Sequence, residues 1–188
     1  NTLFENVRSK PNSLNHTLLS SPRTDDPTCY FTVDLVLVAL PSLSSAVKSV
    51  EEAYFKLQLI SLRLAEPHSL NLDGLFGVLH NIAWTNKGPI LSDDVNKERL
   101  SHQLSSSPLI VSHVDKFPYL VNYHQPSGTR IASGSQVRLG AHLGEGTTVM
   151  PAGYVNFNAG SKGAAMIEGR VSAGVVIGKD TDIGGGAS

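Results

Sequence analysis

The sequence has one cysteine, Cys29, among its 188 residues, so no disulfide can form within the chain. This scarcity fits a protein of the reducing cytosol, and we expect a cytoplasmic location. Long apolar runs are also missing. The longest, Val33 to Leu40, is interrupted by Asp34 and falls far short of the roughly 20 residues that a membrane helix needs. No apolar core follows a basic start, so no secretory signal is predicted.

An excess of charge of either sign is absent as well. Fifteen Lys and Arg residues against 16 Asp and Glu residues give a net charge of −1, and the pI is about 6.7. This balance offers no electrostatic basis for binding nucleic acid or an anionic membrane. With 40% hydrophobic and 16% charged residues, the composition is that of an ordinary globular protein. We therefore expect small-molecule partners, no nucleic acid and no membrane.

Three segments of different character are predicted along the chain. Residues 1–28 are polar and rich in Ser, Asn and Pro, which indicates a loose N-terminal segment. Residues 29–128 predict an α/β domain, and residues 129–188 predict the start of a repeat structure. Because the chain begins at Asn1 rather than methionine and ends at Ser188 inside the repeat, we expect a fragment that lacks its C-terminal part.

The α/β domain is expected to hold two helices and at least one strand. Ser44–Ala65 carries apolar residues at three-four spacing, with Ser45 or Ser49 as its cap, two early glutamates, and Lys56 and Arg63 late, as the helix dipole prefers. The other expected elements are a buried strand or core helix over Cys29–Leu40, a short helix within Asn71–His80, a strand over Leu109–Val114, and irregular chain over Trp84–Pro89 and Asp115–Gly128.

From Ile131 onward an aliphatic residue recurs every six positions, with small residues between. The repeat covers Ile131, Val137, Leu143, Val149 and Val155, and it resumes at Val171, Ile177 and Ile183. A six-residue period is typical of a parallel β-helix, in which three hexapeptides complete one triangular coil and Gly or Asn turns the corners. We expect about three coils, stabilised by stacking on one another. Residues near Ser161 to Arg170 break the repeat, which predicts an inserted loop or a slip of the coil.

The segments around this break resemble a known enzyme family. "MIEGRVSAGVVIGKDTDIGGGAS" (Met166–Ser188) and "GEGTTVMPAGYVNFNAG" (144–160), with "NIAWTN" (Asn81–Asn86) and "VDKFP" (Val114–Pro118) upstream, are similar to the long proteobacterial and actinobacterial branch of the tetrahydrodipicolinate N-succinyltransferases. The resemblance covers roughly residues 50 to 188. It implies a left-handed parallel β-helix behind an N-terminal α/β domain, and a homotrimer with active sites between neighbouring β-helices.

The resemblance also implies a reaction and a site. Members of this family transfer succinyl from succinyl-CoA, a co-substrate rather than a bound cofactor, to the amino group of ring-opened tetrahydrodipicolinate in diaminopimelate and lysine biosynthesis. By family position Glu168 is the catalytic residue, and Arg170, Gly185 and Ser188 contact succinyl-CoA. The parent protein is therefore expected to be an acyltransferase, whereas the 188 residues alone could be an inactive scaffold.

The chemistry supports these residue types. An amine that attacks a thioester must lose a proton, and the resulting oxyanion needs hydrogen-bond donors. Glu168 could be the general base, or it could attack first and form a mixed anhydride. Arg170 offers a fork of donors to a carboxylate, and backbone N–H groups of Gly184–Gly186 can approach an oxygen closely. Alternatively, Glu168 and Arg170 form an ion pair between subunits, and the glycines only turn a corner.

The sequence departs from the family at one kind of site. The acidic residues that bind a metal ion on the trimer axis would fall at Ser135 and Ala152, and neither side chain is a carboxylate. We therefore predict no such ion here, and a trimer held by packing.

Two rival functions use the histidines. His142 could serve as the base of another CoA-dependent hexapeptide acyltransferase. However, it precedes the interior position Leu143, so we expect an outward-facing surface or interface histidine. His124 and His142 lie eighteen residues apart, one coil, as in a zinc hydro-lyase, but a catalytic zinc needs three protein ligands and no histidine follows His142.

Overall fold

The computed structural model describes residue 40 and residues 42–103 and 108–188. All of these belong to one compact unit, Val38–Ser188. The loose segment predicted for residues 1–28 and the element predicted for Cys29–Leu40 lie outside the described residues, apart from Leu40 itself. Within the described part, no helix is long and apolar enough to cross a membrane.

Helix α3, Val50–Ser61, confirms the predicted helix and shortens it at both ends. The Ser49 side chain caps it by accepting a hydrogen bond from the Glu52 N–H, as expected for one of the two candidate serines. The helix stops before Arg63, whose φ of +60° is left-handed. The prediction of basic residues late in the helix is wrong, because the last turn contains none and Arg63 lies outside the helix.

Lys56 is fully buried in α3 and joins two chain segments. Its ammonium donates to the carbonyl oxygens of Ser45 at 2.5 Å and Asn71 at 2.7 Å. Burial lowers the pKa of this ammonium, and the nearby Glu52 carboxylate opposes that effect only partly. The two carbonyl bonds replace the water that the buried charge has lost. Lys56 thus holds the chain before α3 against the chain after it.

A small antiparallel sheet follows the short helix α4, Leu75–Val78, which confirms the helix expected there. The sheet has the order β2-β1-β3, with β1 Ile82–Thr85, β2 Gly88–Leu91 and β3 Val111–Asp115. The strand expected over Leu109–Val114 is therefore present, shifted slightly. The irregular chain expected over Trp84–Pro89 is wrong, because only Asn86 and Lys87 turn between the paired strands. The Thr85 hydroxyl donates to the Gly88 carbonyl and closes this turn.

Two further elements were not foreseen. Helix α5, Val95–Gln103, has the polar sequence VNKERLSHQ, which offers no apolar stripe to detect. The 3₁₀ helix η1, Leu120–Asn122, is one short turn inside the segment expected to be irregular, and it buries Leu120.

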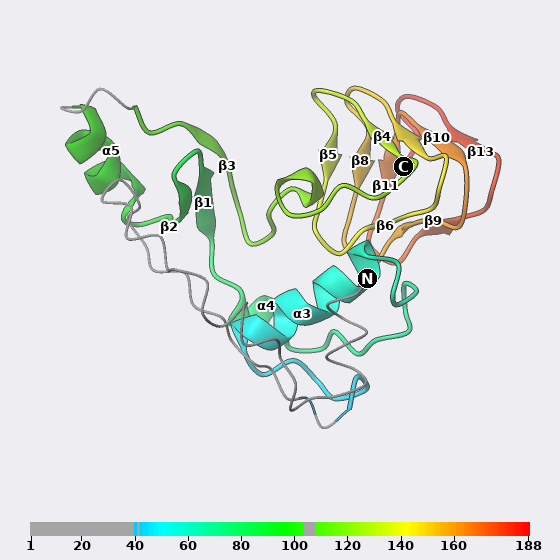
Figure 1. Cartoon of the computed structure of the whole chain (residues 1–188), viewed down its shortest axis with the longest axis horizontal. Coiled ribbons are helices and arrows are strands. Elements are labelled where there is room, and N and C mark those ends of the chain that lie inside the picture. Colours follow the sequence, from blue (N-terminus) through cyan, green and yellow to red (C-terminus); the bar gives the residue numbers. More distant parts are fainter. Residues whose placement is uncertain (1–39, 41, 104–107) are drawn as a thin grey trace, which may run out of the picture. The chain divides into compact units, whose positions relative to one another are not determined.

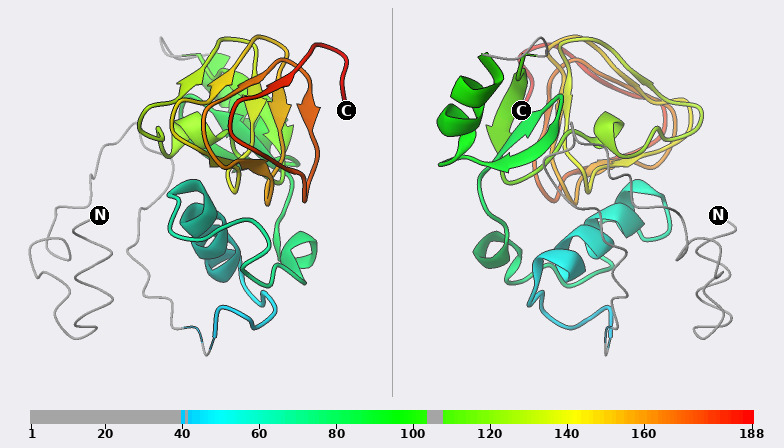
Figure 2. Two further views of the ribbon diagram at one scale, coloured as in Figure 1. Left: turned by 90° about the vertical axis from the view of Figure 1, so that its right-hand side faces the viewer. Right: turned by 60° about the vertical axis from the view of Figure 1, so that its left-hand side comes forward.

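The remainder of the chain winds into a parallel β-helix with three sheets, β13-β10-β7-β4, β11-β8-β5 and β12-β9-β6. Every pairing in these sheets is parallel and joins strands one coil apart. The right-hand view of Figure 2 shows the triangular outline of the coils. The strands are β4 Arg130–Ile131, β5 Gln136–Val137, β6 His142–Leu143, β7 Thr148–Val149, β8 Tyr154–Val155, β9 Gly160–Ser161, β10 Ala165–Ile167, β11 Arg170–Val171, β12 Val176–Ile177 and β13 Thr181–Ile183 (Figure 1).

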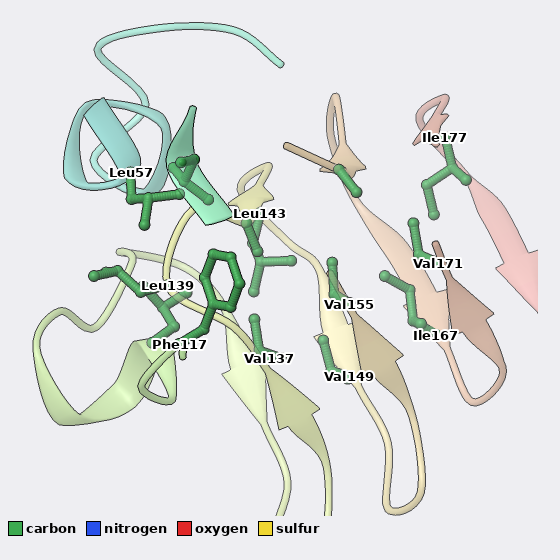
Figure 3. Packing of buried hydrophobic residues seen from close by; sticks show 14 of the residues in the cluster. Leu57, Phe117, Val137, Leu139, Leu143, Val149, Val155, Ile167, Val171 and Ile177 are labelled. Carbon is green, nitrogen blue, oxygen red and sulfur yellow. The ribbon is translucent and has the colours of Figure 1, made fainter. Parts of the chain in front are cut away.

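The interior of the prism is a set of stacked side chains from equivalent positions (Figure 3). Val137, Val155 and Val171 stack along one sheet, and each is at most 2% exposed. Val149 and Ile167, both fully buried, stack along another. Since one coil exposes its apolar residues unless a neighbour covers them, stacking supplies the burial that stabilises each coil.

The six-residue repeat continues through the segment where the sequence indicated a break. Ser161 and Ile167 occupy the next two interior positions, paired with Leu143 and Val149, and both are fully buried. Ser161 is tolerated inside because its hydroxyl contacts the Thr147 hydroxyl at 2.7 Å and accepts from the Gly144 N–H at 3.1 Å. The expected inserted loop is therefore wrong.

The irregularity is instead a deletion at one corner. Interior residues normally follow each other after six positions, but Val171 follows Ile167 after only four. The corner between β10 and β11 therefore consists of Glu168 and Gly169 alone, whereas the equivalent corner one coil earlier has the four residues 150–153. The slip of the coil that the sequence indicated is confirmed and located here.

Helix α3 and the chain around Phe117 share one core with the β-helix. Leu57 of α3 and Phe117 are buried in the same cluster as Leu139 and Leu143 (Figure 3). The approach is close at Gly140, where a Cβ would lie 2.5 Å from a methyl carbon of Leu57. The first coil is thus covered by the segments that precede it in the chain.

Gly160 should be the least replaceable of the glycines in the coils. Its φ is +147°, and a Cβ there would lie 1.8 Å from the His142 carbonyl oxygen on the neighbouring strand. Because strain and overlap add, Gly160→Ala should destabilise the full-length protein by about 3 kcal/mol or more. Gly77→Ala is the control, because nothing lies within 4 Å of its Cβ position. Urea or thermal unfolding of both variants measures the difference, and wild-type stability of Gly160→Ala would contradict the packing described.

Candidate functional site

The shortened corner is the centre of the candidate site. Gly169 lies directly against the turn of the next coil, since a Cβ there would be 2.6 Å from the carbonyl oxygens of Gly184 and Ala187. The N–H groups of Glu168 and Gly169 both donate to the Ile183 carbonyl, at 2.8 and 3.1 Å. Two adjacent donors on one acceptor fix the corner tightly beneath the Gly184–Ala187 turn.

Glu168 projects from this corner as an exposed carboxylate. Its Oε2 atom is 3.8 Å from the position that a Cβ would take on Gly185, so the carboxylate lies beside that glycine. Within the described residues, the carboxylate accepts no hydrogen bond and pairs with no cation. A carboxylate that lies beside an open glycine turn, without a cation paired to it in the described residues, is available to take a proton or to attack an electrophile.

Arg170 leaves the same corner two residues later. Its backbone N–H donates to the Ala187 carbonyl at 2.8 Å, which joins it to the glycine turn. Its guanidinium carbon lies 4.3 Å from the centre of the Tyr154 ring, and its Nε donates to the Ser172 hydroxyl at 3.2 Å. Within the chain as described, Arg170 makes no ion pair with Glu168. The alternative of an ion pair between subunits stays a prediction.

The glycine turn itself follows β13, the strand that begins a further coil after the third. Gly186 is left-handed at φ +83°, and the Ala187 N–H donates back to the Gly184 carbonyl at 3.1 Å. The corner role that the sequence allowed for these glycines is therefore present, and it leaves them exposed, together with Ser188. The four residues singled out in the sequence thus meet at one corner across two successive coils.

A polar network that the sequence did not predict adjoins this corner. Arg138 donates from Nε and Nη2 to the Asp115 carboxylate at 3.0 and 2.7 Å, and from Nη1 to the Asn156 side-chain oxygen at 3.0 Å. Its guanidinium lies 4.9 Å from the Phe117 ring centre and 5.8 Å from that of Tyr154. The six-residue repeat could have shown that Tyr154 and Arg170 lie side by side on the outer face of one sheet, because each directly precedes an interior valine.

A cavity of about 210 Å³ lies between β3 and the outer face of the β-helix. It is lined by His113, Val114, Asp115, Tyr119, Gln136, Arg138 and Tyr154. His113 stacks on Tyr119 with ring centres 3.8 Å apart. Burial lowers the pKa of His113. The hydrogen bond to the Phe117 carbonyl and the negative charge of Asp115 oppose this effect, and the positive charge of Arg138 reinforces it.

The His142 side chain is buried rather than exposed. It is 6% exposed, and its Nδ1 lies 3.4 Å from the Ala65 carbonyl oxygen in the segment that follows α3. The ring faces outward from the prism as predicted, but it is covered, so the surface alternative is wrong and the interface alternative stays a prediction. A thioester could not reach the ring in this position, so the structure does not favour His142 as the base of an acyltransferase.

Neither metal hypothesis gains support from the side chains in place. Over residues 42–103 and 108–188, no group of three or more His, Cys, Asp or Glu residues could hold a metal ion. At the two positions where the family implies an axial ion, the Ser135 hydroxyl donates to the Ala132 carbonyl, and Ala152 is an exposed corner residue with φ +67°. These residues supply no carboxylate, so they do not fit a hard cation such as Mg²⁺.

The parallel strands and their six-residue repeat define a hexapeptide-repeat β-helix protein. The family model described as tetrahydrodipicolinate N-succinyltransferase N-terminal matches residues 34–77, and the one described as tetrahydrodipicolinate N-succinyltransferase middle matches residues 79–119. The chain belongs to the tetrahydrodipicolinate N-succinyltransferase family.

Curated relatives carry the name 2,3,4,5-tetrahydropyridine-2,6-dicarboxylate N-succinyltransferase. The protein of Vibrio cholerae is 58% identical over 154 residues, which is 82% of this chain and 45% of the relative. The protein of Pseudomonas aeruginosa is 50% identical over 153 residues, 81% of this chain and 44% of the relative. That of Salinispora tropica is 52% identical over 151 residues, 80% of this chain and 47% of the relative. The chain therefore spans a little under half the length of these relatives.

A crystal structure from Campylobacter jejuni, described as a 2,3,4,5-tetrahydropyridine-2-carboxylate N-succinyltransferase, is similar in fold. The TM-score is 0.69 at 40% identity, over 76% of this chain and 38% of that chain. Together with the described strands, this confirms the expected fold class, an N-terminal α/β region followed by a left-handed parallel β-helix of about three coils.

The corner at Ala152 gives a second stability prediction. A left-handed φ of +67° strains a residue with a Cβ, so Ala152→Gly should stabilise the full-length protein by roughly 0.5–1 kcal/mol. Ala132→Gly is the matched control in the equivalent corner, because Ala132 has no positive φ and should lose stability through added backbone freedom. Unfolding midpoints of both variants test this, and a loss of stability in Ala152→Gly would contradict the strain.

Proposed function

We propose that the full-length protein is a tetrahydrodipicolinate N-succinyltransferase. It transfers the succinyl group of succinyl-CoA to the amino group of ring-opened tetrahydrodipicolinate, in diaminopimelate and lysine biosynthesis. The observation that carries the proposal is the shortened corner, where the Glu168 carboxylate lies beside Gly185 and the Arg170 guanidinium emerges two residues later. Membership of the family supplies the substrate class.

In the direct route, Glu168 acts as a general base. Its carboxylate accepts a proton from the attacking amine while the nitrogen forms a bond to the thioester carbon. The negative charge that develops on the carbonyl oxygen is stabilised by N–H groups of the exposed Gly184–Gly186 turn. When this tetrahedral intermediate collapses, the new C–N bond remains and the thioester C–S bond breaks. CoA leaves as a thiolate that takes up a proton.

In the two-step route, Glu168 is the nucleophile. A carboxylate oxygen attacks the thioester carbon, CoA leaves as thiolate, and a mixed anhydride joins succinyl to Glu168. The amine then attacks the succinyl carbonyl of the anhydride and releases the Glu168 carboxylate. Both routes need the same exposed, uncompensated carboxylate, and both give the same amide product.

Arg170 selects the acyl group in this proposal. Its two terminal nitrogens can donate side by side to the free carboxylate of succinyl, a geometry that lysine cannot offer. Gly185 leaves room for the acyl chain, and the Ser188 hydroxyl is an additional donor to the CoA portion. We further propose a cytoplasmic homotrimer in which packing, rather than an axial metal ion, holds the subunits together.

A coupled assay of the full-length protein tests the activity. Thiol release from succinyl-CoA should require tetrahydrodipicolinate or an aminopimelate analogue, because without an acceptor amine no stable product forms. Acetyl-CoA should be a poor donor, since it has no carboxylate for Arg170. Equal turnover of acetyl-CoA with unrelated amines would refute the proposal.

The carboxylate is tested by Glu168→Gln, which keeps the shape and removes the charge. We expect kcat to fall by about 100-fold or more, because the amide is neither a base nor a nucleophile. Glu145→Gln, at another exposed corner carboxylate, is the control and should keep wild-type rates. Near-normal turnover of Glu168→Gln would remove Glu168 from the mechanism.

A further inference from the structure

Two arginines lie near one aromatic ring on the outer face of the β-helix. Tyr154 is paired in register with Arg170 on one side and with Gln136 on the other. The Arg170 guanidinium carbon is 4.3 Å from the ring centre, and that of Arg138 is 5.8 Å from it. Both distances fall within the range of cation–π attraction, which depends on the negative charge of the ring face.

The two arginines differ in how their charge is compensated. Asp115 binds Arg138 through two nitrogens and Asn156 binds the third, so Arg138 has a neutralising partner and no spare nitrogen. Arg170, in contrast, has only the neutral Ser172 hydroxyl on its Nε among the described residues. Since Asp115 cancels the charge of Arg138, the ring can hold Arg170 without strong repulsion from the second cation.

The contacts of Arg170 also fix its orientation. The Tyr154 ring restricts the plane of the guanidinium, and Ser172 occupies Nε, which leaves both terminal nitrogens for a ligand. A long arginine side chain otherwise loses much conformational freedom when it binds. A guanidinium that is already oriented avoids that cost, and a planar pair of donors matches a carboxylate.

We propose that Tyr154 is a positioning residue that orients Arg170 for the carboxylate of the transferred acyl group. Tyr154 does not touch the reacting atoms and acts through the cation–π contact. The Ser172 hydroxyl is the second contact that orients Arg170, and the Asp115 carboxylate neutralises the charge of Arg138. The inference rests on the proposed function and deepens it, because it assigns the preference for an acyl group that ends in a carboxylate to a contact between neighbouring coils.

The test uses the full-length protein and compares succinyl-CoA with acetyl-CoA as donor and with CoA as a ligand that lacks the acyl group. Tyr154→Leu should lower kcat/KM for succinyl-CoA about tenfold, mainly through KM, and leave CoA affinity and the rate with acetyl-CoA unchanged. Tyr154→Phe keeps the ring and should remain near wild type. Tyr123→Leu is the matched control, because Tyr123 is a half-exposed tyrosine whose ring meets Trp84 edge-on.

Ring electronics separate positioning from a merely structural role. Phenylalanine analogues at position 154 with one, two and three ring fluorines keep the shape but weaken the negative ring face in steps. The KM for succinyl-CoA should rise in the same steps while thermal stability stays constant. In an Arg170→Ala background, Tyr154→Leu should have no further effect on succinyl-CoA.

Three results would overturn the inference. Tyr154→Leu could leave the succinyl-CoA parameters unchanged, it could weaken CoA and acetyl-CoA by the same factor, or fluorination could have no graded effect. If any of these occurs while the wild-type protein prefers succinyl-CoA, only the positioning role is wrong. If the wild-type protein itself shows no preference for succinyl-CoA over acetyl-CoA, the proposed function fails and this inference fails with it.

Discussion

Stacking of one coil on the next is the constraint on which the rest of the structure depends. An interior residue such as Val155 is fully buried because its equivalents one coil away cover it, whereas Ile131 and Ile183, in the first and last of the described coils, are only partly buried. A change in coil length would move every later side chain out of line unless a complete corner absorbed it. The corner formed by Glu168 and Gly169 is two residues shorter than the equivalent corner one coil earlier. It absorbs this difference completely, because Val171, the next interior residue, stacks on Val155. The deviation is therefore confined to one corner.

Because the irregularity is confined to one corner, the rest of the β-helix holds that corner in place for the proposed succinyl transfer. The short corner lies directly against the Gly184–Ala187 turn, and the N–H groups of Glu168 and Gly169 both donate to the Ile183 carbonyl. The carboxylate and the Arg170 guanidinium then emerge from a rigid wall without an ion pair between them. Reactive groups on rigid elements hold their geometry better than groups on loops.

The segments before the β-helix contribute electrostatics as well as packing. Asp115, at the end of β3, compensates Arg138 on the β-helix, and Phe117 packs against the same guanidinium. Through the Tyr154 ring, this pair adjoins Arg170. The N-terminal region therefore influences the charge environment of the site even though it supplies none of the four residues singled out in the sequence.

The sequence predicted the β-helix well because the six-residue repeat is a strong local signal, and glycines at left-handed corners such as Gly140 and Gly146 reinforce it. It left the irregularity spread over Ser161 to Arg170, because Ser161 is polar and was not identified as an interior position, which hid the continuation of the repeat to Ile167. Helix α5 was missed because its sequence has no apolar face. The Arg138–Asp115 pair was missed because contacts between residues distant in sequence leave no local pattern. The roles of the candidate site residues remain predictions.

A crystal structure of the full-length protein with succinyl-CoA would show whether the shortened corner binds the acyl group. We expect the succinyl carboxylate on the two terminal nitrogens of Arg170, the Arg170 guanidinium still against Tyr154, and the thioester carbon within reach of Glu168. A succinyl group bound elsewhere, with Arg170 and Glu168 free of ligand, would contradict this expectation.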